Sequence, residues 1–88
     1  LPHLAALGEG ELEIIEAHLQ FGSPAIGRAP RELDIPEGCS LFAVIRDGVA
    51  TPLTPDSVLA EGDKVIAIGP NDCEAMLHEQ LIGANPVA

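Results

Sequence analysis

The sequence is short of aromatic and basic residues, and each shortage argues against a class of partner. Phe21 and Phe42 are the only aromatic residues among 88, so no set of rings is available on which bases or sugars could stack. Lysine and arginine together number four against 14 acidic residues, which gives a net charge of −10. Nucleic-acid backbones and anionic membrane surfaces attract clustered Lys and Arg, so we expect the chain to bind neither.

A cysteine framework and a long apolar run are also missing. Cys39 and Cys73 form no CxxC pair, and we expect both to be reduced and buried. No apolar run approaches the roughly 20 residues that span a bilayer, and no secretory leader is recognisable. We therefore expect no direct membrane insertion and a cytosolic setting. A start at Leu1 instead of Met predicts that the chain is a piece of a longer protein.

The residues that could carry catalysis are scattered. His3, His18 and His78 lie in three separate segments, and none has a Ser, Cys or Asp partner in a recognised motif. Ser23 and Ser57 lack the context of a nucleophile elbow. The sequence therefore predicts that the protein is not an enzyme.

Glu16 and His18 are the candidate ligands for a metal ion. Glu16 and His18 alternate along a predicted strand, so their side chains share a face. Their spacing matches no known metal-binding loop, such as the EF-hand. We expect a solvated strand face here, and no metal.

Apolar periodicity predicts four strands. Residues 11–21 alternate, and their buried face comprises Ile15, Ala17, Leu19 and Phe21. The remaining strands are predicted at 40–46, 49–53 and 64–68. Asp47-Gly48 suits the tight turn of a hairpin, and Asp63 can accept backbone N–H groups within its own turn.

Two short helices complete the predicted α+β fold with a small, mostly antiparallel sheet. One covers 30–33, with Pro30 at its first position. The other follows Gly69-Pro70, with Asn71 or Asp72 as its cap, and has an apolar stripe. The stripe comprises Cys73, Met76, Leu77 and Leu81. We expect a domain at 11–83, a linker or the tail of an upstream nucleotide-binding domain at 1–10, and a C-terminal tail at 84–88.

Two strands are apolar on both faces, at 41–45 and 65–68. In the first of them, Leu41, Ala43 and Ile45 are expected on one face and Phe42 and Val44 on the other. Two short helices cover one face of a sheet, and exposed apolar patches mark interfaces. The pattern predicts a homodimer, and the alternative is that loops fold over the second face. The residues that we assign to the core or the dimer interface are Leu41, Phe42, Val44 and Ile66.

Three segments match a known pattern in order and in spacing. Residues 23–33 read SPAIGRAPREL, similar to S-P-x-x-G-[KR]-x-x-x-E-L, and residues 41–48 read LFAVIRDG, similar to a strand ending in Arg-x-Gly. Residues 59–69 read LAEGDKVIAIG, similar to L-x-x-G-D-x-[LV]-x-[VI]-x-G. Over roughly residues 11 to 82, the chain thus resembles the TrkA-C (RCK-C) domain of Trk-type potassium uptake regulatory proteins. Residues 1–10 resemble the junction that follows their Rossmann-like domain.

The resemblance implies a cytoplasmic regulatory domain that dimerises and couples ligand state to the gating of a potassium transport system. It implies an upstream nucleotide-binding domain, which would hold NAD(H) or ATP/ADP, and no cofactor in this domain. It implies a membrane potassium transporter subunit as partner, which would hold the protein at the inner face of the membrane. The alternative is a ligand-sensing TrkA-C domain of a cation/proton antiporter or another transporter.

Some branches of the family bind cyclic dinucleotides at the dimer interface. A phosphate ligand needs a cation, and the candidates here are Arg28 and Arg46. The branch that binds cyclic di-adenosine monophosphate carries Arg and Asn in the loop before the second strand, whereas residues 36–40 have neither. The other interpretation of both arginines is surface ion pairing with nearby carboxylates.

Overall fold

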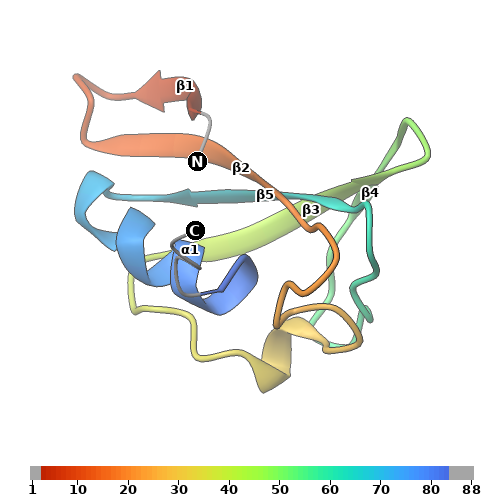
Figure 1. The fold of residues 1–88 in the computed structure, drawn as a ribbon. Coiled ribbons are helices and arrows are strands. Elements are labelled where there is room, and N and C mark those ends of the chain that lie inside the picture. Colours follow the sequence, from red (N-terminus) through yellow and green to blue (C-terminus); the bar gives the residue numbers. More distant parts are fainter. Residues whose placement is uncertain (1–2, 84–88) are drawn as a thin grey trace.

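Five antiparallel strands form a single sheet in the computed structural model, which describes residues 3–83. The strands are β1 (His3–Leu7), β2 (Leu12–His18), β3 (Ser40–Arg46), β4 (Val49–Pro52) and β5 (Lys64–Gly69). Their order is β1-β2-β5-β3-β4, so β5 lies at the centre although it comes after the other four in the chain (Figure 1). The predicted antiparallel sheet is confirmed. The tail predicted at 84–88 lies outside the described residues.

The helix predicted at 30–33 is shorter than expected. The structure has only a three-residue 3-10 turn there, η1 (Pro30–Glu32). It ends because Leu33 adopts an extended backbone, with ψ at 149°, and packs its side chain against the core. Within residues 3–83, a single α-helix therefore accompanies the sheet instead of the two helices predicted.

That α-helix is α1 (Glu74–Leu81), and it continues directly from a 3-10 turn, η2 (Asn71–Cys73). The predicted side-chain caps are wrong, because Asn71 and Asp72 lie inside η2 and neither makes a cap bond. The turn instead begins at Pro70, whose extended backbone leads out of β5.

β1 extends the sheet into the segment 1–10, which was predicted as a linker or a tail. It pairs with β2, from Leu7 opposite Leu12 to His3 opposite Ile15, with an irregularity between His3 and Ala5. All five of its residues are exposed, so no burial pattern marked it as a strand. Whether this segment belongs to an upstream domain stays a prediction.

The alternation predicted for residues 11–21 breaks down after Leu19. Leu19 is fully buried as predicted, but the Ser23 N–H then bonds to the Gln20 carbonyl at 2.9 Å and closes a turn. The Ser23 hydroxyl accepts the Gln20 N–H at 3.0 Å and fastens the same turn. The assignment of Phe21 to the buried face is therefore wrong, because the turn directs it outward, where it is 91% exposed.

The core lies between one face of the sheet and α1 with its neighbouring loops, all of which lie on the same side (Figure 1). Its buried members are Ile15, Ala17, Leu19, Ala25, Leu59, Val65, Ala67, Cys73, Leu77 and Leu81. The predicted stripe on α1 is confirmed except at Met76. The Met76 side chain is 49% exposed.

The hairpin of β3 and β4 turns where it was predicted to turn. Asp47 has φ of 53° and Gly48 has φ of 79°, and a tight turn that matches strand twist needs positive φ at both positions. Val49 lies opposite Arg46, so the turn consists of Asp47 and Gly48 alone.

Cys39 and Cys73 are joined in a disulfide, which corrects the prediction of two reduced thiols. The two residues are 34 positions apart, and they meet because β3 and η2 begin close together beside the end of β5. Cys73 is buried as predicted, and Cys39 is half-buried. The bridge ties the start of α1 to the loop that precedes β3.

Candidate interaction surface

The face of the sheet that points away from α1 is largely apolar; we call it the outer face. Residues paired directly across neighbouring strands share a face, so the register assigns its members. In β1, β2 and β4 they include Ala5, Leu7, Leu12, Ile14, Glu16, Ala50 and Pro52, and in β3 and β5 they include Ala43, Ile45, Ile66 and Ile68. None of them belongs to the buried core cluster.

Helix, turns and loops leave this face open. Figure 1 shows α1, η1 and the long loops together on the opposite side of β2, β5 and β3. Ile14, Ile45 and Ile68 are only partly buried, and Leu7 and Leu12 are exposed. An apolar face that residues 3–83 leave uncovered is characteristic of an interaction site.

A β-bulge changes which residues of β3 reach the outer face. The register on β5 shifts between Leu41 and Ala43, which leaves Phe42 as the extra residue. Leu41 and Val44 consequently lie on the core side, opposite Ala67 and Val65, while Ala43 moves to the outer face. The predicted alternation, with Leu41 and Ala43 on one face, is therefore wrong.

The four residues predicted for the core or the interface thus separate. Leu41 is half-buried against the core, and Val44 is buried on the same side. Ile66 lies on the outer face and is only 6% exposed. Phe42 remains 42% exposed at the bulge. Whether any of them touches a second copy stays a prediction.

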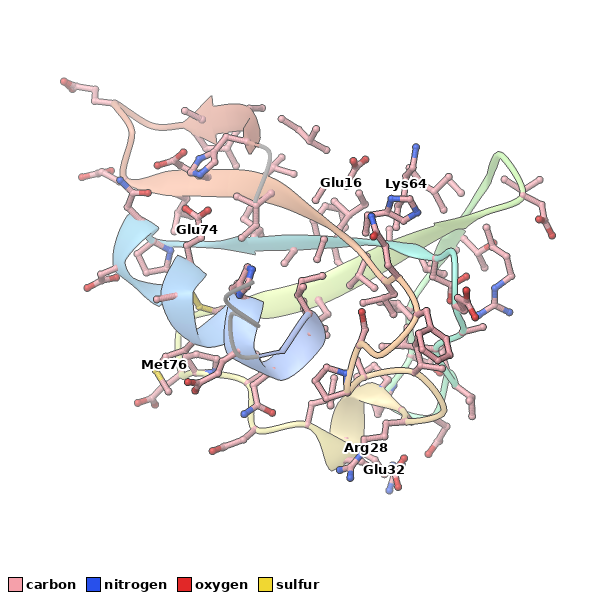
Figure 2. The ribbon with its side chains drawn as sticks, viewed as in Figure 1. Glu16, Arg28, Glu32, Lys64, Glu74 and Met76 are labelled. Carbon is pink, nitrogen blue, oxygen red and sulfur yellow. A yellow bond between two sulfur atoms is a disulfide. The ribbon has the colours of Figure 1, made fainter. Side chains whose placement is uncertain are left out.

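Polar and charged residues lie at one end of the outer face. His18 lies opposite Lys64, and Glu16 lies opposite Ile66. Figure 2 shows Glu16 and Lys64 on neighbouring strands, both on the side away from α1. The outer face therefore has an apolar centre with a mixed-charge border, as protein interfaces do.

Arg46, a predicted ligand-binding residue, pairs with Asp63 across neighbouring strands. Because Ile45 lies opposite Lys64, the next residues of β3 and of the turn before β5 are neighbours. Arg46 donates from Nε and from Nη2 to the two carboxylate oxygens of Asp63, both at 2.7 Å, and Nη2 also donates to the Val58 carbonyl at 3.1 Å. The geometry is the bidentate one in which arginine binds carboxylates most strongly.

Asp63 is fully buried, and Arg46 is the main reason why it remains charged. The Arg46 guanidinium, helped by the Ala60 N–H at 2.9 Å, holds the pKa of Asp63 below its usual value against the opposing effect of burial. The prediction that Asp63 accepts a backbone N–H of its own turn is confirmed. The pair locks the turn before β5 to the end of β3.

Arg28, the other predicted ligand-binding residue, lies in the loop before η1, on the side of the sheet that carries α1 (Figure 2). Its carbonyl accepts the Leu59 N–H at 2.9 Å, while its side chain is exposed. Arg46 lies on the same side, since it shares its face with Val44. Neither arginine is on the outer face, and their role in binding a ligand stays a prediction.

A cluster of acidic and imidazole groups ties β1 to the rest of the fold. His3 contacts Glu13 of β2 through Nδ1, and its Nε2 lies 2.7 Å from Glu74 of α1. These partners, Glu13 first, raise the pKa of His3. The sequence could not show this cluster, because Glu74 is 71 positions from His3.

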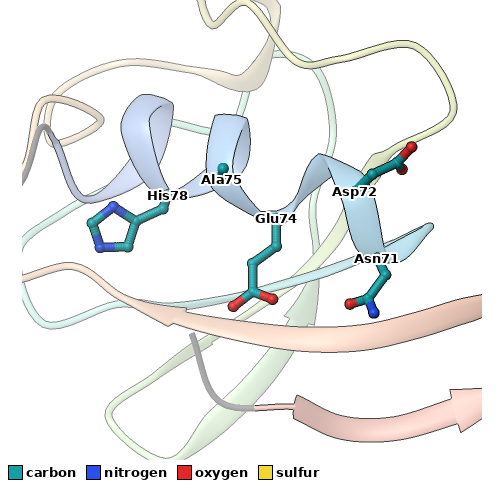
Figure 3. A pocket seen from close by; sticks show the side chains of 5 residues that line it. All are labelled: Asn71, Asp72, Glu74, Ala75 and His78. Atoms are coloured by element: carbon teal, nitrogen blue, oxygen red, sulfur yellow. The ribbon is translucent and has the colours of Figure 1, made fainter.

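Glu74 also belongs to a surface hollow along η2 and α1. Its lining side chains, drawn in Figure 3, are Asn71, Asp72, Glu74, Ala75 and His78. No group of three or more His, Cys, Asp or Glu side chains within residues 3–83 is arranged to hold a metal ion. In the same range, no helix is long and apolar enough to cross a membrane.

Comparison with known proteins places this fold in a family. The model of the TrkA-C domain matches residues 14–81, which run from β2 to the end of α1. The chain is also similar to the Trk system potassium uptake protein TrkA of Azorhizobium caulinodans, with 36% identity over 61 residues. That alignment covers 69% of this chain but only 13% of the relative. The sequence-based resemblance is thereby confirmed, and the chain belongs to the TrkA-C domain family.

Proposed function

We propose that this domain is the dimerising, regulatory part of a potassium uptake system. Membership of the TrkA-C family and similarity to a protein named for potassium uptake support this role. The same relative does not favour the alternative of an antiporter domain. The observation that carries the proposal is the outer face, which is apolar at Ile14, Ile45 and Ile68 and is not covered by α1 or its loops.

In this proposal two copies pack their outer faces together, and the pair transmits a change of geometry to a membrane transporter subunit. An effector can shift such a pair only if its two arrangements differ in free energy of interaction with that effector. We place nucleotide binding, of NAD(H) or ATP/ADP, in an upstream domain and assign no catalysis to this one. The assembly would work in the cytoplasm, at the inner face of the membrane.

The oligomeric state tests the first half of the proposal. Ile68→Lys introduces a charge on the central strand of the outer face, whereas Met76→Lys introduces the same charge on the exposed side of α1. In sedimentation, we expect the chain and Met76→Lys to be dimers and Ile68→Lys to be a monomer. A monomeric parent chain at high micromolar concentration would refute the dimer, as would equal behaviour of the two variants.

Potassium uptake tests the second half. The same two substitutions are introduced into the protein as the cell makes it, in cells that depend on it for uptake. We expect Ile68→Lys to reduce uptake and Met76→Lys to leave it unchanged. Normal uptake with a monomeric Ile68→Lys variant would separate dimerisation from transport and contradict the proposed coupling.

A further inference from the structure

Two matching turns hold the cysteines that form the disulfide. Each cysteine is the third residue after a proline, in Pro36-Glu37-Gly38-Cys39 and in Pro70-Asn71-Asp72-Cys73. In each turn the cysteine N–H donates to the proline carbonyl at 3.1 Å. The backbone therefore fixes both cysteines by the same local bond, independently of the link between their sulfurs.

The space beside the two sulfurs is kept open by Gly69, the last residue of β5. A Cβ at this position would lie 2.7 Å from Cys73 Sγ, 2.8 Å from Cys39 Sγ and 3.2 Å from Cys39 Cα. Of nine glycines in the chain, eight have positive φ, and Gly69 is the one that does not. Glycine is therefore needed here for the room that the sulfurs occupy and not for its backbone freedom.

The site also suits the reduced state. Cys73 Sγ lies 3.1 Å from the Pro70 carbonyl oxygen, a distance at which a thiol would donate a hydrogen bond. A disulfide has no hydrogen to donate, so this acceptor gains its sulfur partner only after reduction. α1 keeps its hold on the core in either state through Leu77 and Leu81, which are both fully buried.

Access to the two sulfurs is unequal. Cys73 is buried beneath the start of α1, whereas Cys39 is half-buried in the loop before β3. A small reagent from solution therefore meets Cys39 first. In exchangeable pairs, an accessible thiol that reacts first commonly stands beside a second thiol that completes the bond.

We propose that Cys39 and Cys73 are a reversible dithiol–disulfide pair that exchanges with low-molecular-weight disulfides and thereby sets how firmly α1 is attached to the sheet. This goes beyond the regulatory role proposed above and does not depend on dimerisation. When the pair is oxidised, Cys73, the residue directly before α1, is covalently joined to the loop before β3. When it is reduced, the two sulfurs must move apart, and α1 is retained by its apolar side chains and by polar contacts such as those of Glu74 with His3 and of Gln80 with the Asp34 N–H.

The internal disulfide forms in two successive thiol–disulfide exchanges. The Cys39 thiolate attacks one sulfur of the small disulfide, a new S–S bond forms, and one small thiolate leaves. The Cys73 thiolate then attacks Cys39 Sγ, the internal bond forms, and the second small thiolate leaves. Two electrons pass from the protein thiols to the small disulfide, and the two protons end on the released thiols. Reduction by two small thiols is the reverse.

The test equilibrates the chain with mixtures of reduced and oxidised glutathione, then traps and counts free thiols by mass spectrometry. We expect excess reduced glutathione to open the pair and oxidised glutathione to close it again. Amide hydrogen exchange is measured in both states, and we expect amides of α1 to exchange roughly tenfold faster or more when the pair is open, with β5 unchanged. A bond that resists reduced glutathione, thiols that do not close, equal exchange, or global unfolding on reduction would each overturn the proposal.

Two variants make the test specific. Cys39→Ser removes the bond without adding bulk, and we expect exchange at α1 to be fast and identical in the two glutathione mixtures. Gly69→Ala keeps both thiols but places a methyl group against both sulfurs. We expect it to fold in reduced glutathione and to form the internal bond far less readily. Normal bond formation in Gly69→Ala would refute the role assigned to this glycine and the geometry on which the pair depends.

Discussion

Removal of the Asp63 carboxylate should cost this small domain much of its stability. Asp63 accepts two hydrogen bonds from Arg46 and one from the Ala60 N–H, and its side chain is fully buried. Asp63→Ala removes both carboxylate oxygens and with them all three hydrogen bonds. The guanidinium of Arg46 recovers water, since 49% of that side chain is exposed, but the Ala60 N–H has no such route if the turn stays closed.

The magnitude follows from these contacts. Hydrogen bonds to a charged group contribute about 1.5–3 kcal/mol, and a buried donor left without an acceptor costs about 1–3 kcal/mol. Because solvent screens the exposed half of the ion pair, we expect Asp63→Ala to lower the unfolding free energy by about 3 kcal/mol. Asp63→Asn keeps an oxygen for the Ala60 N–H, and we expect about half of that loss.

Urea unfolding followed by circular dichroism measures the effect. With a slope of about 1 kcal/mol per molar urea for a chain of this size, Asp63→Ala should lower the midpoint by about 3 M. The matched control is Asp56→Ala, which breaks the exposed pair of Asp56 with Arg31, also at 2.7 Å. We expect that variant to change the unfolding free energy by no more than about 0.5 kcal/mol. Equal losses in the two variants would refute the reasoning.

The same pair gives a dependence on pH with a definite sign. The pKa of Asp63 in the folded state is held below its unfolded value of about 3.8. Its contribution is therefore fully present above about pH 4 and is lost as the pH falls through the folded-state pKa. The difference in stability between the parent chain and Asp63→Ala should accordingly shrink in acid and stay constant from pH 5 to 8. A difference that grows in acid would contradict the assignment.

Two further predictions concern residues that the fold places unexpectedly. Leu19→Ala should lower the unfolding free energy, measured in urea, by about 2–5 kcal/mol because Leu19 is fully buried. Phe21→Ala should change it by no more than about 0.5 kcal/mol because Phe21 is exposed. Similar losses would contradict the turn that separates them. For His3, whose pKa is raised, the tie of β1 to its acidic partners is complete below about pH 6.5 and is lost as the pH rises through the folded-state pKa. Amide exchange of β1 should therefore quicken with pH more than that of β5, relative to intrinsic rates, and His3→Gln should abolish this excess.

The sequence was informative wherever local chemistry decides the structure. Asp47-Gly48 accepts positive φ, so the hairpin could be placed to the residue. Apolar alternation located β2, and short segments that are apolar on both faces located β3 and β5. The α1 stripe was visible for the same reason. The apolar character of both strand faces also predicted a second apolar face, covered either by another copy or by loops.

Other features depend on contacts that local patterns do not encode. The bulge at Phe42 reassigns every preceding side chain of β3, yet nothing in the alternation marks it. β1 carries no burial pattern, since all its residues are exposed. Arg46 was predicted as a ligand-binding residue or a surface ion-pair partner, and Asp63 as a turn residue. Only the register of β3 on β5 brings the two together. The disulfide joins residues 34 positions apart, which meet because β3 and η2 begin beside the end of β5.

The central position of β5 has a consequence for how the domain is made. β2 and β3 do not pair with each other; each pairs with β5, which begins at Lys64. During synthesis from the N-terminus, the hairpins β1–β2 and β3–β4 cannot join into one sheet until β5 has been synthesised. Isolated hairpins are marginal in water, so chains that stop before residue 64 should be substrates for proteases, and folding should be a single late event.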